Sequence, residues 1–296
     1  MSTAPPNAPR PGTPAHLRPR RRAGRRRGRL VGAVGAVGAA VALGGVVAGR
    51  LRATSAATRE SEATSLSAPA RRAILPPPLA QPTAARPLGI LEIGDSLGED
   101  LGFGLEGVLG RDPRVVLHTE AVGDTGLANV AYYNWPATFE RELRTFHPGL
   151  VVVFIGGNDA QGFDVGSRPA LFGTPFWRAA YAARVRTMMA EATAAGAHVL
   201  WVGMPVMGPG TGLSPDMAKL DAIYASVARS FPLVRYLSTW RLLETSSGQF
   251  ATSLPNGSGQ LVTVRDPDGV HLTGAGGDLA ARAVVGAVRA DWHVRL

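Results

Sequence analysis

From residue 87 to the C-terminus, short apolar runs alternate with longer segments whose apolar residues recur at helical spacing. Short runs bounded by turn residues are typical of buried strands, and the longer segments are typical of amphipathic helices. The predicted strands are 88–93, 115–119, 150–155, 198–203 and 233–237, and the predicted helices are 97–109, 136–146, 177–195, 215–229 and 274–289. This alternation favours an α/β domain with a parallel sheet and crossover helices.

The predicted helix at 215–229 has clear signals at its start and on its buried face. Ser214 is a suitable N-cap, and Pro215 suits the first helical position. Its apolar residues form a single stripe, which assigns them to the core rather than to a site: Met217, Leu220, Ile223, Tyr224 and Val227.

The first 86 residues divide into three segments of different composition. Residues 1–29 are rich in proline and arginine, residues 30–49 carry no charge, and residues 50–86 are rich in Ser, Ala and Pro. An uncharged helix of this length spans about 30 Å, the thickness of a bilayer core. We therefore predict a basic cytoplasmic tail (1–29), a transmembrane anchor (30–49), a linker (50–86) and an extracytoplasmic domain (87–296). A cleaved signal peptide, giving a secreted protein, is the alternative, because small residues follow at 53–57.

The basic net charge of the chain, +9, belongs to the tail. Residues 1–52 contain eleven arginines and no acid, which leaves −2 for the rest of the chain. Because the basic cluster precedes an uncharged span, we interpret it as the cytoplasmic flank of a membrane anchor and expect no nucleic-acid partner.

Three polar motifs lie where predicted strands end or a helix begins. Ser96 follows the first strand, where a hydroxyl would lie at the ligand-binding edge of an open α/β sheet. Asn158 follows the third strand and could donate an amide N–H to an oxyanion. Asp268 precedes His271 by three residues, so that the carboxylate can orient the ring toward a nucleophile. Asp95 and Asp159 are expected to hold their turns through backbone hydrogen bonds.

On these motifs the chain resembles the SGNH (GDSL-type) serine hydrolases. Residues 94–97 (GDSL), 156–159 (GGND) and 268–271 (DGVH) match three blocks of that family. The resemblance implies a flavodoxin-like three-layer α/β/α sandwich of about five parallel strands. It also implies a triad of Ser96, Asp268 and His271, with an oxyanion hole formed by Ser96, Asn158 and a glycine. That glycine is Gly123, with Gly126 as the alternative.

We therefore expect a serine esterase that hydrolyses acyl esters, with acetyl esters on cell-envelope carbohydrate as the proposed substrate class. Small-molecule esters remain an alternative substrate. Two other functions stay open: an O-acyltransferase that uses the same triad, and a non-catalytic module that binds the cell envelope.

No cofactor and no metal are expected. The segment 102–107 matches a dinucleotide-binding fingerprint, but it begins well past the end of the first strand, where that fingerprint would have to lie. The chain has no cysteine, and its histidines form no pair with metal-ligand spacing. Tyr132, Tyr133 and Trp135 could stack on a sugar ring or pack in the core.

Overall fold

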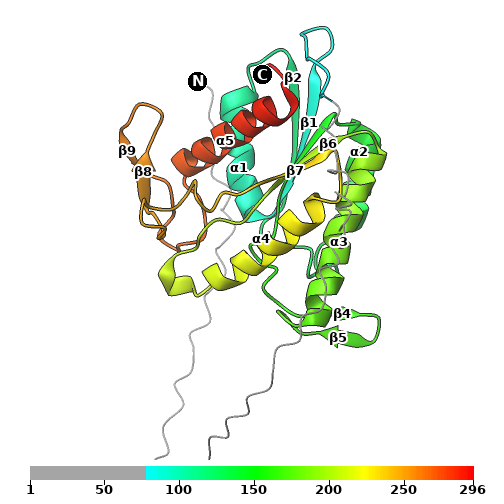
Figure 1. Ribbon diagram of the computed structural model, residues 1–296. Coiled ribbons are helices and arrows are strands. Elements are labelled where there is room, and N and C mark those ends of the chain that lie inside the picture. Colours follow the sequence, from blue (N-terminus) through cyan, green and yellow to red (C-terminus); the bar gives the residue numbers. More distant parts are fainter. Residues whose placement is uncertain (1–77) are drawn as a thin grey trace, which may run out of the picture. The chain divides into compact units, whose positions relative to one another are not determined.

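The structure, a computed structural model, describes residues 78–296 and has a five-stranded parallel sheet at its centre (Figure 1). The strand order is β2-β1-β3-β6-β7. The bounds are β1 (Leu88–Gly94), β2 (Val115–Ala121), β3 (Leu150–Phe154), β6 (His198–Val202) and β7 (Val234–Leu237). All four pairings are parallel, and each strand matches its prediction to within two residues at either end. This is the flavodoxin-like order, and the predicted fold is confirmed.

Helices cover both faces of the sheet (Figure 1). One face carries α1 (Ser96–Leu109) and α5 (Gly274–Trp292), which pack against each other. The other carries α2 (Trp135–Phe146), α3 (Pro175–Ala194) and α4 (Ser214–Ala228), in contact as neighbouring pairs. All five correspond to predicted helices. Their buried apolar residues form one core with β3 and β6, whose side chains are all buried.

The strand register explains why the polar motifs meet at one edge. Gly94, at the end of β1, lies level with Ala121 of β2 on one side and with Phe154 of β3 on the other. The residues that follow these three strands therefore leave the sheet side by side. From β1 the chain passes to β2 on one side of it and then to β3 on its other side. The carboxyl edge of β1 is therefore a topological switch point, where open α/β sheets bind ligands.

A close crossing of α1 and α5 brings the two ends of the domain together. A Cβ on Gly104 of α1 would lie 2.3 Å from the carbonyl oxygen of Gly277 of α5, so neither helix could approach this closely with a larger residue there. Near this crossing, the carboxylate of Asp100 on α1 accepts the N–H of Leu272, just before α5, at 2.8 Å. The start of α5 is thereby fixed beside the start of α1.

Two short hairpins and a 3₁₀ turn were not predicted. The hairpins are β4 (Phe163–Val165) with β5 (Arg168–Ala170), and β8 (Ser253–Pro255) with β9 (Leu261–Thr263), and the turn is η1 (Pro209–Thr211). Strands of three residues are too short to show an alternating pattern in the sequence. Only the pairing of one strand with the other reveals them.

The predicted N-cap role of Ser214 is wrong. Helix α4 begins at Ser214 itself, and the preceding Leu213 caps it without a side-chain hydrogen bond. The Ser214 hydroxyl instead accepts the N–H of Met207 at 2.9 Å and donates to the carbonyl oxygen of Met207 at 3.0 Å. It therefore holds the loop after β6 against α4.

The domain packs against residues that the sequence assigns to the linker. Leu79 is buried in the core. The Gln81 side chain donates to the carbonyl oxygen of His293 (2.6 Å) and accepts the N–H of Arg295 (3.1 Å). Within residues 78–296, no helix is long and apolar enough to cross a bilayer. The predicted tail and anchor, 1–29 and 30–49, lie outside the described residues.

Candidate active site

Ser96 is the first residue of α1 and lies at a turn fixed by Asp95. The Asp95 carboxylate is fully buried and accepts the backbone N–H groups of Leu97 (3.0 Å), Gly156 (2.8 Å) and Gly157 (2.7 Å). Burial raises the pKa of Asp95 to about 6, although the three N–H groups favour the ionised form. Asp95 therefore holds the serine turn, as the sequence predicted, and also ties it to the loop after β3.

The three predicted catalytic side chains form one hydrogen-bonded row. Ser96 Oγ lies 2.9 Å from His271 Nε2, and His271 Nδ1 lies 2.6 Å from Asp268 Oδ2. The other oxygen of Asp268 accepts the N–H groups of Val270 (2.8 Å) and His271 (3.1 Å). Residues 175 positions apart in the chain thus meet at the edge of the sheet.

The charges around this row favour a histidine that can take up a proton. The hydrogen bond from His271 lowers the pKa of Asp268 to about 2, so this carboxyl is ionised at neutral pH. Burial lowers the pKa of His271, but the hydrogen bond and charge of Asp268, with the charges of Asp100 and Asp266, outweigh burial and raise it. An imidazolium at this position is therefore stabilised by its surroundings.

Asp100 is a functional candidate that sequence reasoning missed. Besides accepting the N–H of Leu272, its carboxylate faces His271 from α1. Burial raises the pKa of Asp100 to about 6, whereas the Leu272 N–H and the charge of His271 act in the opposite direction. Asp100 lies in no motif, and only the packing of α1 on α5 brings it to the site.

The Asn158 side chain is oriented by the loop after β2. Its Nδ2 donates to the carbonyl oxygen of Thr125 at 2.9 Å. The Thr125 hydroxyl in turn donates to the carbonyl of Val122 (2.5 Å) and accepts the indole N–H of Trp135 (3.0 Å). Since a carboxamide nitrogen carries two hydrogens, one N–H of Asn158 is left for another acceptor.

The two candidate glycines differ in their surroundings. The N–H of Gly123 donates to a carboxylate oxygen of Glu99 at 3.0 Å, and Glu99 lies one turn beyond Ser96 on α1. Gly126 is buried, and a Cβ on it would lie 2.2 Å from Asp159 Oδ1. Gly123 therefore lies on the side of the nucleophile but with its N–H already bonded, whereas Gly126 packs against a buried carboxylate.

Asp159 is the centre of a buried network that holds these loops. It accepts the N–H groups of Leu127 (2.9 Å) and Ala128 (2.7 Å) and the hydroxyl of Tyr181 (2.5 Å). The Tyr181 hydroxyl lies 2.9 Å from that of Tyr224, which donates to the carbonyl oxygen of Ile155, just after β3. Asp159 thus joins the loop after β2 to the loop after β3, whereas the sequence predicted that it would hold its own turn.

Comparison with protein families identifies the family of this chain. The profile of a family described as "Protein of unknown function (DUF459)" matches residues 89–287. The chain belongs to the DUF459 family. No curated protein matches the sequence.

Solved structures share the fold of the DUF459 domain at low sequence identity. A Bacteroides fragilis protein, provisionally assigned as an acylhydrolase, is 15% identical with a TM-score of 0.50, over 72% of this chain and 92% of that one. An acetylxylan esterase from Geobacillus stearothermophilus is 14% identical (TM-score 0.49; 71% and 97% covered). A GDSL-like lipase from Bacteroides thetaiotaomicron is 15% identical (TM-score 0.48; 72% and 92% covered). The likeness to the first shows that this chain has the same α/β/α fold.

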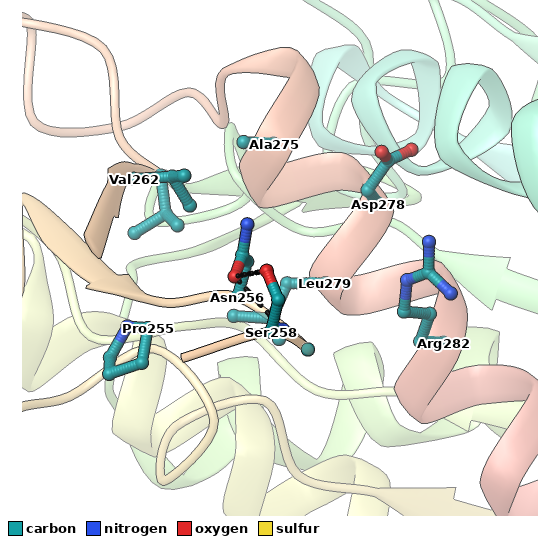
Figure 2. Close-up of a pocket in the computed structure, with 10 residues that line it drawn as sticks. Pro255, Asn256, Ser258, Val262, Ala275, Asp278, Leu279 and Arg282 are labelled. Atoms are coloured by element: carbon teal, nitrogen blue, oxygen red, sulfur yellow. Dashed lines mark hydrogen bonds between the residues drawn. The ribbon is translucent and has the colours of Figure 1, made fainter. Parts of the chain in front are cut away.

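Two cavities lie beside the second half of the DUF459 domain. One, of about 430 Å³, lies between the β8–β9 hairpin and α5 (Figure 2). Its polar lining residues are Asn256, Ser258, Asp278 and Arg282, and none of the catalytic candidates lines it. The side-chain oxygen of Asn256 already accepts three bonds within the hairpin turn. The other, of about 530 Å³, is lined mainly by the loop after β6 and by Trp240 and Phe250. It adjoins the turn from Asp268 to His271, which we call the acid–base turn, because the N–H of Gly208 in its wall donates to the carbonyl oxygen of Gly269 at 2.7 Å.

His118, Glu120 and Glu142 lie close enough to one another to hold a metal ion. Their contacts indicate another role. His118 bonds to Glu142 at 3.0 Å, Arg141 pairs with both glutamates, and the Tyr133 hydroxyl donates to Glu120 at 2.7 Å. We interpret the cluster as an ion-pair network that fastens α2 to β2.

Of the aromatic residues that could stack on a sugar ring, Trp135 is a core residue and Tyr132 is exposed.

Proposed function

We propose that this DUF459 protein is a serine esterase that hydrolyses acyl esters. The observation that carries the proposal is the row Ser96–His271–Asp268 at the switch point of the sheet. A hydroxyl bonded to an imidazole that is itself oriented by a carboxylate is the arrangement that activates a serine nucleophile. A serine with only a structural role at the start of α1 would need neither the histidine nor the carboxylate.

In the proposed reaction, Ser96 Oγ attacks the ester carbonyl and His271 Nε2 takes its proton. Asp268 stabilises the imidazolium that forms. His271 then gives this proton to the leaving alcohol, so that the ester C–O bond breaks and an acyl-serine remains. A water molecule, deprotonated by His271, attacks the acyl-serine and releases the acid. His271 returns the proton to Ser96 Oγ.

Three groups would hold the negative oxygen that develops during each attack. These are the N–H of Ser96 at the start of α1, the remaining N–H of Asn158, and the N–H of Gly123, with Gly126 as the alternative. Such donors act on charge that exists only in the transition state, so they lower the barrier rather than tighten substrate binding. If Gly123 is the third donor, the oxyanion must displace Glu99 from it.

The proposed substrate is an acyl ester, of the acetyl class, on cell-envelope carbohydrate. The basic segment followed by uncharged residues 30–49 supports a domain anchored outside the cytoplasmic membrane. A periplasmic or surface reporter fused after Leu296 should then be active. A mature N-terminus near residue 57 would instead establish a cleaved signal.

An activity-based fluorophosphonate tests the chemistry on the full-length protein. Wild type should be labelled at Ser96 and should release acetate from 4-nitrophenyl acetate and from acetylated oligosaccharides. Absence of both labelling and hydrolysis would favour the non-catalytic binding module. Acylation of an added cell-wall oligosaccharide faster than release of free acid would establish the transferase.

A further inference from the structure

Arg265 is a buried cation that no motif singles out. It lies between β9 and the acid–base turn, and its side chain is 1% exposed. No carboxylate of the described domain forms an ion pair with it. Burial lowers its pKa to about 10, so the guanidinium remains charged at neutral pH. Burying a charge that forms no direct ion pair is costly, and it requires hydrogen bonds in compensation.

Apart from a 3.5 Å contact of Nη2 with Met207 Sδ, its bonds go to backbone carbonyls of two different segments. Nη1 donates to Val206, in the loop after β6, at 2.7 Å. Nη2 donates to Gly269 (3.1 Å) and Val270 (2.8 Å). The guanidinium also lies 4.9 Å from the ring centroid of Phe250, in a third segment. Arg265 is thus the point at which three loops meet.

Two of its acceptors lie inside the acid–base turn itself. Gly269 and Val270 are the only residues between Asp268 and His271 in the sequence. Gly269 has a left-handed backbone (φ +75°), and its carbonyl also accepts the N–H of Gly208 at 2.7 Å. With these carbonyls held by Arg265, the flanking Asp268 and His271 side chains are left to face each other and Ser96.

We propose that Arg265 is the positioning residue of the acid–base turn, and that its bonds to Gly269 and Val270 set the separation of His271 and Ser96. The proposal rests on the esterase function proposed above. A planar guanidinium can reach carbonyls on two segments at once in a fixed geometry, whereas a lysine ammonium is a flexible point charge. A misplacement of a catalytic group by about 1 Å can lower the rate about 10²-fold. Loss of the Arg265 guanidinium should therefore act mainly on kcat.

The test uses full-length Arg265→Met and Arg265→Lys. Arg235→Met is the matched control, because Arg235 also donates to two carbonyls, Pro232 (3.3 Å) and Val234 (2.9 Å), but at the start of β7. With 4-nitrophenyl acetate, Arg265→Met should lose about 10²-fold in kcat with KM changed less than about twofold. Arg265→Lys should lose about tenfold, and Arg235→Met should match wild type.

The pH profile separates positioning from a merely structural role. The charged groups that face His271 are Asp268 and Asp266 on its own turn and Asp100 on α1. Arg265 offsets the charges of Asp268 and Asp100. Without its positive charge the imidazolium is more stable, the pKa of His271 rises, and the acid limb of kcat/KM should move to higher pH. The limb should move in Arg265→Met and stay in place in Arg265→Lys, which keeps the charge.

The outcomes distinguish this inference from the proposed function. A wild type that is neither labelled nor active contradicts the esterase function itself. An active wild type with both Arg265 variants within about twofold in kcat overturns the positioning role alone, as does a loss confined to KM. If Arg265→Met does not fold, Arg265→Lys decides: a lower kcat at unchanged KM and melting temperature supports the proposal, and an unchanged kcat overturns it.

Discussion

The two sides of the candidate site are held by opposite charges. On the nucleophile side, two buried carboxylates each accept two backbone N–H groups, Asp95 from the loop after β3 and Asp159 from the loop after β2. Asp95 accepts a third N–H at the start of α1. On the acid–base side, the buried guanidinium of Arg265 donates to carbonyls of two loops.

The difference follows from which backbone groups each side leaves unpaired. A helix start and glycine-rich turns present free N–H groups, which an anion satisfies. The turn between Asp268 and His271 presents carbonyls, which only a donor can satisfy. Each of these three buried ions is therefore bonded to the backbone of the loops it joins, without a direct ion pair to a counter-ion.

Removing either reacting side chain, Ser96 or His271, should have the largest effect on kcat. Ser96→Ala and His271→Ala should each lower kcat by about 10⁴–10⁶, and the double variant should fall hardly further, because the pair acts as a unit. Steady-state kinetics of the three variants checks this. Retention by Ser96→Ala of more than about a tenth of wild-type activity contradicts the assignment.

Loss of the amide on the nucleophile side should cost less. Asn158→Ala should lower kcat by about 10²–10³ with little change in KM, since the amide acts on charge that develops in the transition state. Fluorophosphonate should still label Ser96, but more slowly. An effect on KM alone would reassign Asn158 to ground-state binding.

Glu99 offers a way to identify the third oxyanion donor. If Gly123 is that donor, Glu99→Ala removes a competing acceptor and should raise kcat by about 2- to 10-fold, the equivalent of one hydrogen bond of ~0.5–1.5 kcal/mol. If Gly126 is the donor, kcat should stay at the wild-type value. Glu106→Ala, on the exposed side of α1 and farther from Ser96, is the control.

Glu92 tests whether the N–H donors are what make a buried carboxylate favourable. It is fully buried on β1 beneath Gly98 and Gly102 of α1, and neither of its carboxyl oxygens has a hydrogen-bond partner. Burial, with the charges of Asp95 and Glu99, raises its pKa well above the usual value, so it is protonated in the fold over a wider pH range than in the unfolded chain.

A raised folded-state pKa contributes stability that is full below the unfolded pKa and is lost as pH rises toward the folded one. Glu92→Gln, which cannot ionise, should therefore unfold at a higher temperature than wild type at pH 8, and the difference should shrink toward pH 4.5. Activity should be unchanged. Thermal melts at several pH values measure this, and a gap that does not depend on pH would contradict it.

The sequence predicted the main elements because their physical causes are local. Each strand of the central sheet is an apolar run that ends in turn residues, and each helix carries its own apolar stripe. The GDSL, GGND and DGVH motifs are likewise contiguous, and their places at strand ends or before a helix are visible without any contact between them. A serine at a strand end and an Asp three residues before a histidine were enough to suggest a nucleophile and its base.

What only the tertiary structure decided depends on contacts between distant segments. The hydrogen bond between Ser96 and His271 requires the close crossing of α1 and α5 at Gly104 and Gly277. This crossing cannot be predicted from the sequence of either helix alone. The bond from Gly123 to Glu99 arises because β2 ends level with the start of α1. In the sequence, Arg265 lies in no motif that distinguishes it from the other arginines. Its role appears only where three loops converge on it, because the carbonyls that it bonds come together only in the folded chain.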